Sequence, residues 1–189
     1  MKINNIDIDK IYQAEKEICT NVDLAFKIIS VEGYWNFDDD NGQFISSLGS
    51  NNDSHDIVSD NPNFLGGSDK YPEPLKYFLF GIASCFASSY VISASINDVV
   101  LKSLSVKIVG KFNYSYFYSL SNKPKIEEIE LFITVNSNAT KTELVRIKNS
   151  AMECCPALSA IDKSVIVDVQ VLFKDNHAKN KSNVKTKIN

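Results

Sequence analysis

The sequence predicts an α+β fold in which antiparallel sheets pack against two helices. Strands are expected in runs on either side of the helices, which is the pattern of an α+β protein rather than of a parallel α/β sheet. One segment, 77–96, contains no charged residue and has the length of a long buried helix. With 189 residues, of which 44% are apolar, the chain can bury a hydrophobic core. We therefore expect one domain at residues 1–174, followed by a flexible basic tail at 175–189.

The segments before residue 74 are expected to form one short helix and several strands. Residues 8–19 place isoleucines among charges at helical spacing. The stretch "LAFKIISVEGYWNF" (24–37) is rich in β-branched and aromatic residues, which predicts extended structure. Asn41-Gly42 is a signal for chain reversal, and weaker strands are expected in "QFISSLG" and "HDIVSD". The stretch "NPNFLGGSDKYPEP" is predicted to be a long loop because it is rich in glycine and proline.

A long helix is predicted from Pro74 to about Asn97. Proline suits the first turn of a helix, where its missing N–H is not needed. The uncharged segment 77–96 could span a bilayer by length, but it contains five serines and precedes alternating strands, so we expect a buried central helix instead. At 100° per residue, one stripe of this helix surrounds Cys85 and comprises Phe78, Gly81, Ile82, Cys85, Ser89, Ile92 and Ile96.

The remainder of the chain predicts two strands, an amphipathic helix and a final strand. Residues 101–118 and 126–137 alternate apolar and polar side chains, as a half-buried strand does. Residues 140–155 return to helical spacing, and 164–173 alternate again. The apolar positions expected on the buried faces of the strands are Leu104, Val106, Ile108, Phe112, Tyr114, Tyr116, Ile129, Leu131, Ile133, Val135, Val165, Val167, Val169, Val171 and Phe173.

Composition excludes several classes of function. The net charge of −3 and the absence of a basic stripe argue against a nucleic-acid partner. Four cysteines in a chain of this length do not indicate a secreted disulfide scaffold, and the N-terminal residues lack the apolar run of a signal peptide, so we expect a cytoplasmic protein that does not bind membranes. The two histidines, His55 and His177, are not spaced with the cysteines as zinc ligands are, so no metal site and no cofactor is predicted.

The stretch "AMECCPALS" places two adjacent cysteines at the end of the second helix. On a helical projection Ala151 and Cys155 lie about 20° to either side of Leu144, so all three share the apolar face, whereas Cys154 lies about 80° from that face. Pro156 is expected to end the helix and hold Cys155 in its last turn. If that face packs inward, Cys155 points at the core and at the long helix that carries Cys85. From the residues alone, two interpretations remain open: simple packing of a small apolar side chain, or one half of a thiol pair.

Two segments together resemble the OsmC-like protein family. The segment "SDNPNFLGGSDKYPEPLKYFLFGIASCF" is similar to the family's D-x-P…GG-x-D loop, proline and apolar helix ending in A-x-C, and "AMECCPALS" resembles its Cys-Pro motif. The likeness covers roughly residues 24–173. It implies an intertwined homodimer with active sites at the subunit interface and a two-cysteine thiol peroxidase of the organic hydroperoxide resistance type. In that chemistry Cys85 would be the peroxidatic thiolate and Cys155 the resolving thiol, with a dithiol as electron donor.

The sequence departs from the resembled peroxidases at the groups that activate the thiolate. Those members carry a glutamate directly after the helix-opening proline and an arginine in the N-terminal strands. Here Leu75 occupies the glutamate position, and the only arginine is Arg146. Cys85 lies about three turns into its helix, beyond the first-turn reach of the helix dipole. Lys27 and Lys70 are the candidates to supply the missing cation.

Two functions are therefore expected. The first is thiol-dependent reduction of small organic hydroperoxides through Cys85 and Cys155. The second is an OsmC-like dimer without peroxidase activity that binds a small apolar or sulfur-containing ligand. Apolar surroundings such as Phe78, Phe80 and Phe86 would suit a fatty or aryl hydroperoxide, although phenylalanines in such a helix more often belong to the core.

Overall fold

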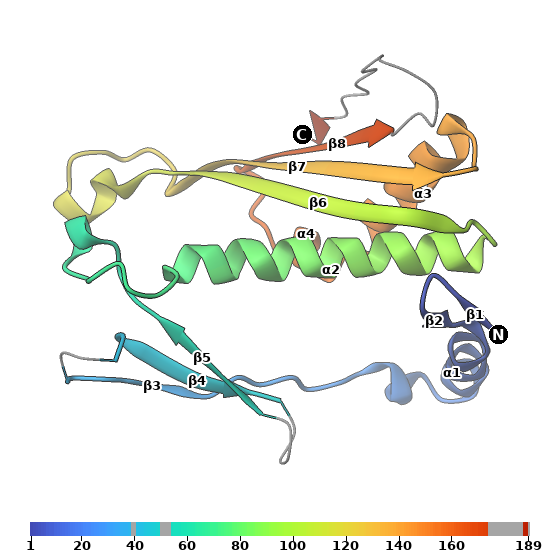
Figure 1. The fold of residues 1–189 in the computed structure, drawn as a ribbon, viewed down its shortest axis with the longest axis horizontal. Coiled ribbons are helices and arrows are strands. Elements are labelled where there is room, and N and C mark those ends of the chain that lie inside the picture. Colours follow the sequence, from blue (N-terminus) through green and yellow to red (C-terminus); the bar gives the residue numbers. More distant parts are fainter. Residues whose placement is uncertain (39–40, 50–53, 174–186, 189) are drawn as a thin grey trace. The chain divides into compact units, whose positions relative to one another are not determined.

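The computed structural model describes residues 1–38, 41–49, 54–173 and 187–188. The chain divides into two compact units (Figure 1): Met1–Gln13 with Leu79–Asn189, and Ala14–Phe78. The elements are, in order, β1 (Lys2–Ile3), β2 (Ile6–Asp7), α1 (Ile8–Thr20), η1 (Val22–Ala25), β3 (Gly33–Trp35), β4 (Phe44–Leu48), β5 (His55–Ser59), η2 (Asn63–Leu65), α2 (Pro74–Ile96), β6 (Leu101–Phe112), η3 (Tyr114–Tyr118), β7 (Ile126–Ser137), α3 (Lys141–Cys154), α4 (Pro156–Ser159), β8 (Ile166–Phe173) and β9 (Lys187–Ile188).

The α+β class is confirmed, but the sheet of the first unit is not wholly antiparallel. Its strand order is β6-β7-β8-β9, and β6–β7 and β8–β9 are antiparallel. The β7–β8 pair is parallel, with Leu131 opposite Val169. The reason is the connection through α3, because a helical crossover returns the chain to the same end of the sheet, where a tight hairpin would reverse it.

One face of this sheet forms the hydrophobic core with α2 and α3. The predicted alternation of β7 is confirmed, since its apolar residues are buried and their neighbours on the other face are not fully so. In Figure 1, α2 runs along the sheet beneath β6 and β7. The buried side chains that meet there are Ile82, Phe86, Tyr90, Ala94, Ile129, Leu131, Ile133, Val135, Leu144, Ile147, Ala151, Cys155, Val167, Val169 and Val171.

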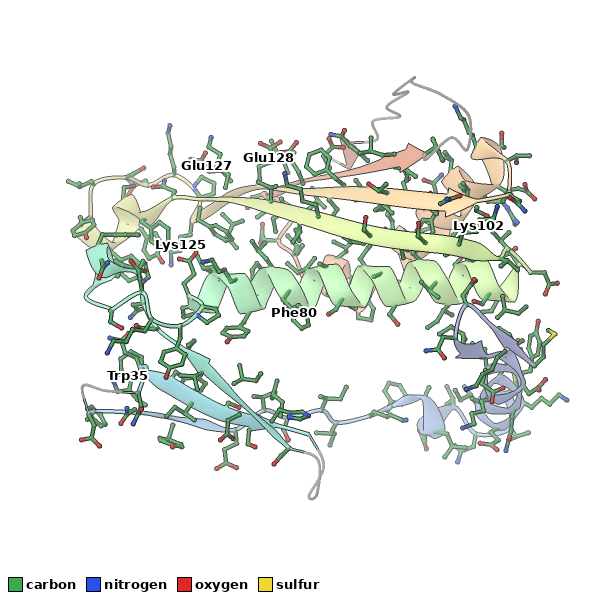
Figure 2. All side chains as sticks on the ribbon, in the orientation of Figure 1. Trp35, Phe80, Lys102, Lys125, Glu127 and Glu128 are labelled. Atoms are coloured by element: carbon green, nitrogen blue, oxygen red, sulfur yellow. The ribbon has the colours of Figure 1, made fainter. Side chains whose placement is uncertain are left out.

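The buried face of α2 overlaps the predicted stripe at Ile82 and otherwise lies beside it. Phe86 and Tyr90 are fully buried, whereas Cys85 and Ser89 lie at the margin of the buried face. The opposite face is uncovered within this unit, and Figure 2 shows Phe80 pointing away from the sheet. Phe80 is 70% exposed. Within the described residues α2 is the one helix long and apolar enough to cross a bilayer, yet its sheet-facing side chains belong to the core just described.

A hairpin at the N-terminus closes the end of α2. β1 and β2 pair through a turn in which Asn4 and Asn5 both have positive φ, which asparagine tolerates better than most residues. The Asn4 side chain donates to Ser95 Oγ at 3.0 Å and to Val99 O at 2.8 Å, and accepts from the Leu101 backbone N–H at 2.8 Å. One amide therefore ties the hairpin to the last turn of α2 and to the start of β6.

The strand predicted over 101–118 is shorter than expected. β6 ends at Phe112, and residues 114–118 form the 3₁₀ helix η3. The Asn113 side chain accepts from the Ser115 N–H at 3.0 Å, a local hydrogen bond that competes with the strand ladder. Tyr114 and Tyr116, predicted to continue the buried face of the strand, instead flank Phe117 in stacked pairs.

The second unit, Ala14–Phe78, contains the three-stranded antiparallel sheet β3-β4-β5. Gly42, with φ +69, precedes β4 at the predicted reversal. The strand expected over 24–37 is wrong in extent: η1 occupies its start, and only Gly33–Trp35 pairs with a neighbour. Residues between them have strand propensity but no partner strand among the described residues, and side chains such as Ile28 remain fully exposed.

The glycine-rich loop of the second unit is organised by a buried carboxylate. Asp60 is 2% exposed and accepts from the Ser68 hydroxyl at 2.5 Å and from the Ser68 N–H at 3.0 Å. These hydrogen bonds lower the pKa of Asp60 below its usual value, with the hydroxyl as the largest cause. A Cβ at Gly67 would lie 1.7 Å from Asn61 O, so only glycine fits there. The D-x-P…GG pattern thus has a structural explanation in the closeness of two loop segments.

Two expectations concern residues that the structure describes only in part. The basic tail predicted at 175–189, with His177, lies outside the described residues except for 187–188, which pair with β8 as β9. The single domain predicted at residues 1–174 stays a prediction.

Candidate functional site

The structure brings the two predicted cysteines together. The sulfur atoms of Cys85 on α2 and Cys155 at the end of α3 are 3.6 Å apart, and the Cys155 thiol donates to the Cys85 sulfur. Seventy residues of sequence separate them. A disulfide needs about 2.05 Å between sulfurs, so they must approach by only about 1.5 Å to bond. The pair is therefore placed for thiol chemistry, and the separate role of each cysteine stays a prediction.

Local sequence signals hold Cys155 in position. α3 begins with a capping box, in which the Thr140 hydroxyl accepts from the Glu143 N–H and the Glu143 carboxylate accepts from the Thr140 N–H. Pro156 ends α3, as predicted, because it cannot continue the hydrogen-bond ladder. Cys155 was expected in the last turn of α3, but it is instead the C-cap residue that follows the helix. Its backbone is extended (φ −82, ψ 110). It is at the same time the residue before α4, where Pro156 occupies the first helical position.

A buried tyrosine fixes α2 against α3. The Tyr90 hydroxyl donates to Leu144 O at 3.2 Å, and its side chain is fully buried. Burial raises the pKa of Tyr90 well above its usual value, so the hydroxyl keeps its proton for this hydrogen bond. Cys85 and Tyr90 on α2 thus meet Cys155 and Leu144 on α3 in reverse order, which makes the two helices antiparallel and sets which α3 residue faces Cys85.

The two thiols differ in access. Cys155 is 1% exposed, and Cys85 is half-buried. Burial raises the pKa of the Cys155 thiol above its usual value, and backbone N–H groups of Leu158 and Ala157 offset this only in part. A molecule in the solvent can therefore reach the Cys85 sulfur more readily than the Cys155 sulfur.

The other two cysteines stay outside this pair. Cys154 is exposed, as its position on the helical projection predicts, and Cys19 is exposed at the end of α1. Among the described residues no group of three or more histidine, cysteine, aspartate or glutamate side chains could hold a metal ion. His55 lies in β5.

The only arginine does not serve Cys85. Arg146 donates to the Asn97 side chain at 2.9 Å, beyond the end of α2. Asn97 follows Cys85 by twelve residues, which is roughly 18 Å along a helix axis. In the described part of the chain, Cys155 is the only side-chain hydrogen-bond partner of the Cys85 sulfur. Lys27 and Lys70 belong to the second unit, and their proposed role stays a prediction.

A family model of "OsmC-like protein" matches residues 67–170 of the chain. This match spans more than half of the sequence and contains both members of the pair, Cys85 and Cys155. The chain belongs to the OsmC-like protein family. The resemblance expected from the two cysteine motifs is thereby confirmed for residues 67–170.

Solved structures show the same OsmC-like fold. An OsmC-like protein from Mycoplasma pneumoniae is 19% identical, with a TM-score of 0.58, and the match covers 78% of this chain and 97% of that one. An organic hydroperoxide resistance protein from Elizabethkingia anophelis, with thiocyanate bound, is 18% identical, with a TM-score of 0.57 and coverage of 77% and 96%. One from Legionella pneumophila is 16% identical, with a TM-score of 0.55 and coverage of 77% and 98%. No relative was found among curated proteins.

Tyr90 is the residue at this site that the sequence did not single out. Its hydrogen bond to Leu144 O aligns α2 and α3 so that Cys85 meets Cys155, and the hydroxyl is not bonded to either sulfur. A signal for it exists in the sequence. Tyr90 is a polar aromatic side chain inside an uncharged helix, and a buried tyrosine hydroxyl needs a partner.

Alkylation of Cys155 in the folded protein is expected to require a higher pH than alkylation of the same residue in urea. The thiolate is the reacting form, and burial raises the folded pKa. By linkage, the contribution of the Cys155 proton to stability is complete below the unfolded pKa and is lost as the pH rises through the folded pKa. Mass spectrometry of the Cys155 peptide after timed iodoacetamide pulses measures both curves. Coincident curves would contradict the burial of this thiol.

Proposed function

We propose that this OsmC-like protein is a thiol-dependent reductase of small organic hydroperoxides, with Cys85 as the peroxidatic residue and Cys155 as the resolving residue. The observation that carries the proposal is the 3.6 Å separation of the two sulfurs, one half-buried and one buried. The names of structural relatives as organic hydroperoxide resistance proteins agree with it.

The reaction divides into three balanced steps. The Cys85 thiol releases its proton, and its thiolate attacks one peroxide oxygen. The O–O bond breaks, the departing alkoxide takes up that proton and leaves as the alcohol, and Cys85 becomes a sulfenic acid. The Cys155 sulfur then attacks the Cys85 sulfur. The Cys155 proton and the sulfenic hydroxyl leave together as water, and the disulfide forms. Finally a dithiol electron donor reduces the disulfide through a mixed disulfide and is itself oxidised.

The half-buried and buried positions suit these different tasks. The first step needs access to the peroxide, which Cys85 has. The second needs a thiol that does not compete for peroxide, and Cys155 is excluded from solvent. Of the phenylalanines considered as pocket residues, Phe86 is a core residue, whereas Phe80 and Phe78 are exposed and could meet an apolar hydroperoxide.

We also propose that the protein works as a homodimer. Monomeric soluble proteins rarely expose large contiguous apolar surfaces. Within the second unit, Phe26 is 77% exposed, Ile28 is 101% and Ile29 is 88%. Each could contribute about 1.5–3 kcal/mol if covered. Phe80 on α2 is likewise an exposed apolar side chain that would be stabilised if a partner covered it. A second copy would cover these surfaces, as the intertwined dimers that the family resemblance implies do.

Static light scattering is expected to give twice the chain mass. Ile28→Lys should shift the equilibrium towards the monomer by at least about tenfold, since it places a charge where an apolar side chain should be buried. Leu120→Lys changes a side chain that is also exposed, at 77%, but lies in the loop after η3, and it serves as the matched control. A native protein with the mass of one chain would remove the dimer proposal.

Peroxidase activity is tested by stopped-flow consumption of cumene hydroperoxide with an excess of dithiol. Cys85→Ser is expected to reduce turnover at least about a thousand-fold, because it removes the nucleophile. Cys154→Ser is the control and should retain activity, since Cys154 lies outside the pair. Wild-type turnover no higher than that of Cys85→Ser would reject the proposed function.

One observation supports the second candidate, an OsmC-like dimer that binds a small apolar or sulfur-containing ligand without peroxidase activity. Arg146 donates to Asn97, beyond the end of α2, and Leu75 cannot act as a glutamate would. The relative from Elizabethkingia anophelis holds a thiocyanate that is derived from the crystallant, so thiocyanate serves here only as a probe. Absence of turnover in the stopped-flow experiment, together with thiocyanate binding detected by calorimetry, would favour this candidate.

The proposed setting is the cytoplasm, where thiols are kept reduced. The proposed partners are a second copy of the chain, a dithiol electron donor and a small hydroperoxide. Neither a nucleic acid nor a membrane is part of the proposal.

A further inference from the structure

We propose that the reduced Cys85–Cys155 pair is also a chelating site for one monosubstituted trivalent arsenical, such as an aryl- or alkylarsenous compound. The inference stands on the position and burial of the two sulfurs and goes beyond the proposed peroxidase, because it requires no peroxide and no turnover. It concerns a ligand that binds the reduced pair and would block both sulfurs at once.

The separation of the sulfurs fits two bonds to one central atom. Two metal–sulfur bonds of about 2.3 Å that meet at the tetrahedral angle hold their sulfurs about 3.8 Å apart. Arsenic–sulfur bonds are of similar length and meet at a somewhat smaller angle, so they require a slightly shorter separation. The two sulfurs stand 3.6 Å apart. A pyramidal arsenic atom could therefore bridge them with little movement of α2 or α3.

Burial selects a neutral product over a charged one. A divalent cation such as Zn²⁺ requires two thiolates, and structural zinc sites use four ligands. Burial raises the pKa of Cys155, which opposes formation of its thiolate, and the described residues offer no third metal-ligating side chain beside the pair. A trivalent arsenical reacts with thiols to give a neutral dithiolate. This product places no charge at the buried sulfur, and the two protein sulfurs together with the organic group fill the three positions of the arsenic atom.

The step balances without an oxidant or a reductant. An arsenoxide, R–As=O, reacts with the two thiols to give R–As(S)₂ and one water. Two As–S bonds form, two S–H bonds and the As=O bond break, and the two thiol protons leave with the oxygen. Arsenic stays trivalent and both sulfurs stay reduced. The first bond forms at half-buried Cys85, and the Cys155 thiol, whose proton already points at the Cys85 sulfur, closes the ring.

The neighbouring cysteine is not expected to take part. Cys154 is exposed on another side of α3, whereas Cys155 belongs to the buried cluster that contains Ala151 and Leu144. Chelation by adjacent Cys154 and Cys155 would require the buried sulfur to turn away from Cys85. The pair on two helices therefore defines the site.

The test uses the full reduced chain and phenylarsine oxide as the probe. Intact mass is expected to show one phenylarsenic group per chain that resists excess glutathione and is removed by a dithiol. Digestion should link the peptide containing Cys85 to the peptide containing Cys155. Cys85→Ser and Cys155→Ser should each bind at least about a hundredfold more weakly, because the second bond of a chelate forms at high effective concentration. Cys154→Ser should bind as the wild type does.

Several outcomes would overturn the proposal. These are an adduct that glutathione removes from the wild-type chain, tight binding that survives in Cys85→Ser, or loss of tight binding in Cys154→Ser. The peptide link is read in the wild type alone, so it decides the matter even if a serine variant fails to fold. Failure of the peroxidase would leave this binding intact, whereas failure of chelation with intact peroxide turnover would reject only the arsenical site.

Discussion

Cys155→Ser is expected to stop the proposed peroxidase after one turnover and to leave Cys85 as a sulfenic acid. The first step does not use Cys155, so one peroxide per chain should still disappear rapidly. The second step then lacks its attacking thiol, and steady-state turnover with a dithiol should fall by at least about a hundredfold. Rapid-mixing measurement of peroxide consumption gives the initial burst, and dimedone labelling followed by peptide mass spectrometry locates the sulfenic acid.

The matched control is Cys154→Ser, which removes the adjacent thiol and should neither slow turnover nor allow dimedone to label Cys85. Multiple turnovers at the wild-type rate in Cys155→Ser would show that another thiol resolves the sulfenic acid. Label found on Cys155 in the wild-type chain would mean that the two roles are exchanged, against the difference in exposure between the two thiols.

The second large effect is expected for Phe86→Ala, which should lower the free energy of unfolding by about 3–5 kcal/mol. Phe86 has no exposed surface and packs where α2 meets the sheet. Its removal takes away the apolar contact and leaves a cavity that the helix and the sheet can fill only in part. Urea titration followed by circular dichroism measures the change. Because Cys85 precedes Phe86, the variant should also lose peroxide turnover at temperatures where it remains folded.

Ile82→Val provides a graded comparison on the same buried face of α2. It removes a single methylene, and the expected cost is about 0.5–1.5 kcal/mol. Ile82 is 3% exposed, so its surroundings are almost as buried as those of Phe86. Equal losses from the two substitutions, or a loss below about 1 kcal/mol for Phe86→Ala, would mean that the contact between α2 and the sheet is not the principal core.

The sequence predicted best where one side chain pattern determines the structure. The alternation of β7 requires one face to be buried, and Pro74 marks the start of α2 because proline suits the first helical turn. The sequence-based prediction was wrong where the structure depends on which strands pair. The segment from 26 to 32 has strand propensity, but a strand needs a neighbour to accept its hydrogen bonds. The parallel β7–β8 pair likewise depends on the path of the connection through α3 and not on composition.

At the candidate site, helical projection correctly separated buried Cys155 from exposed Cys154, since 100° per residue fixes which side chains share a face. It could not give the register between α2 and α3. That register depends on the Tyr90 hydroxyl reaching a carbonyl of α3, a contact between residues 54 apart in sequence. It could not give the place of Arg146 either, because a long side chain at the surface can reach several partners.

The contacts of Asn4 bear on where this fold may be cut. The family match begins at residue 67, which would suggest that a fragment starting there, or at the glycine-rich loop, retains everything essential. Yet Asn4 supplies the acceptor for Leu101 N–H and a donor for Val99 O. Shortening the chain to the matched region would remove the hairpin that covers the end of α2. The Val99 carbonyl and the Leu101 N–H would then lose their hydrogen-bond partner and would have to bond to water. We therefore expect that a shortened version of this protein must keep its first few residues in order to fold, although they contribute nothing to the sulfur pair.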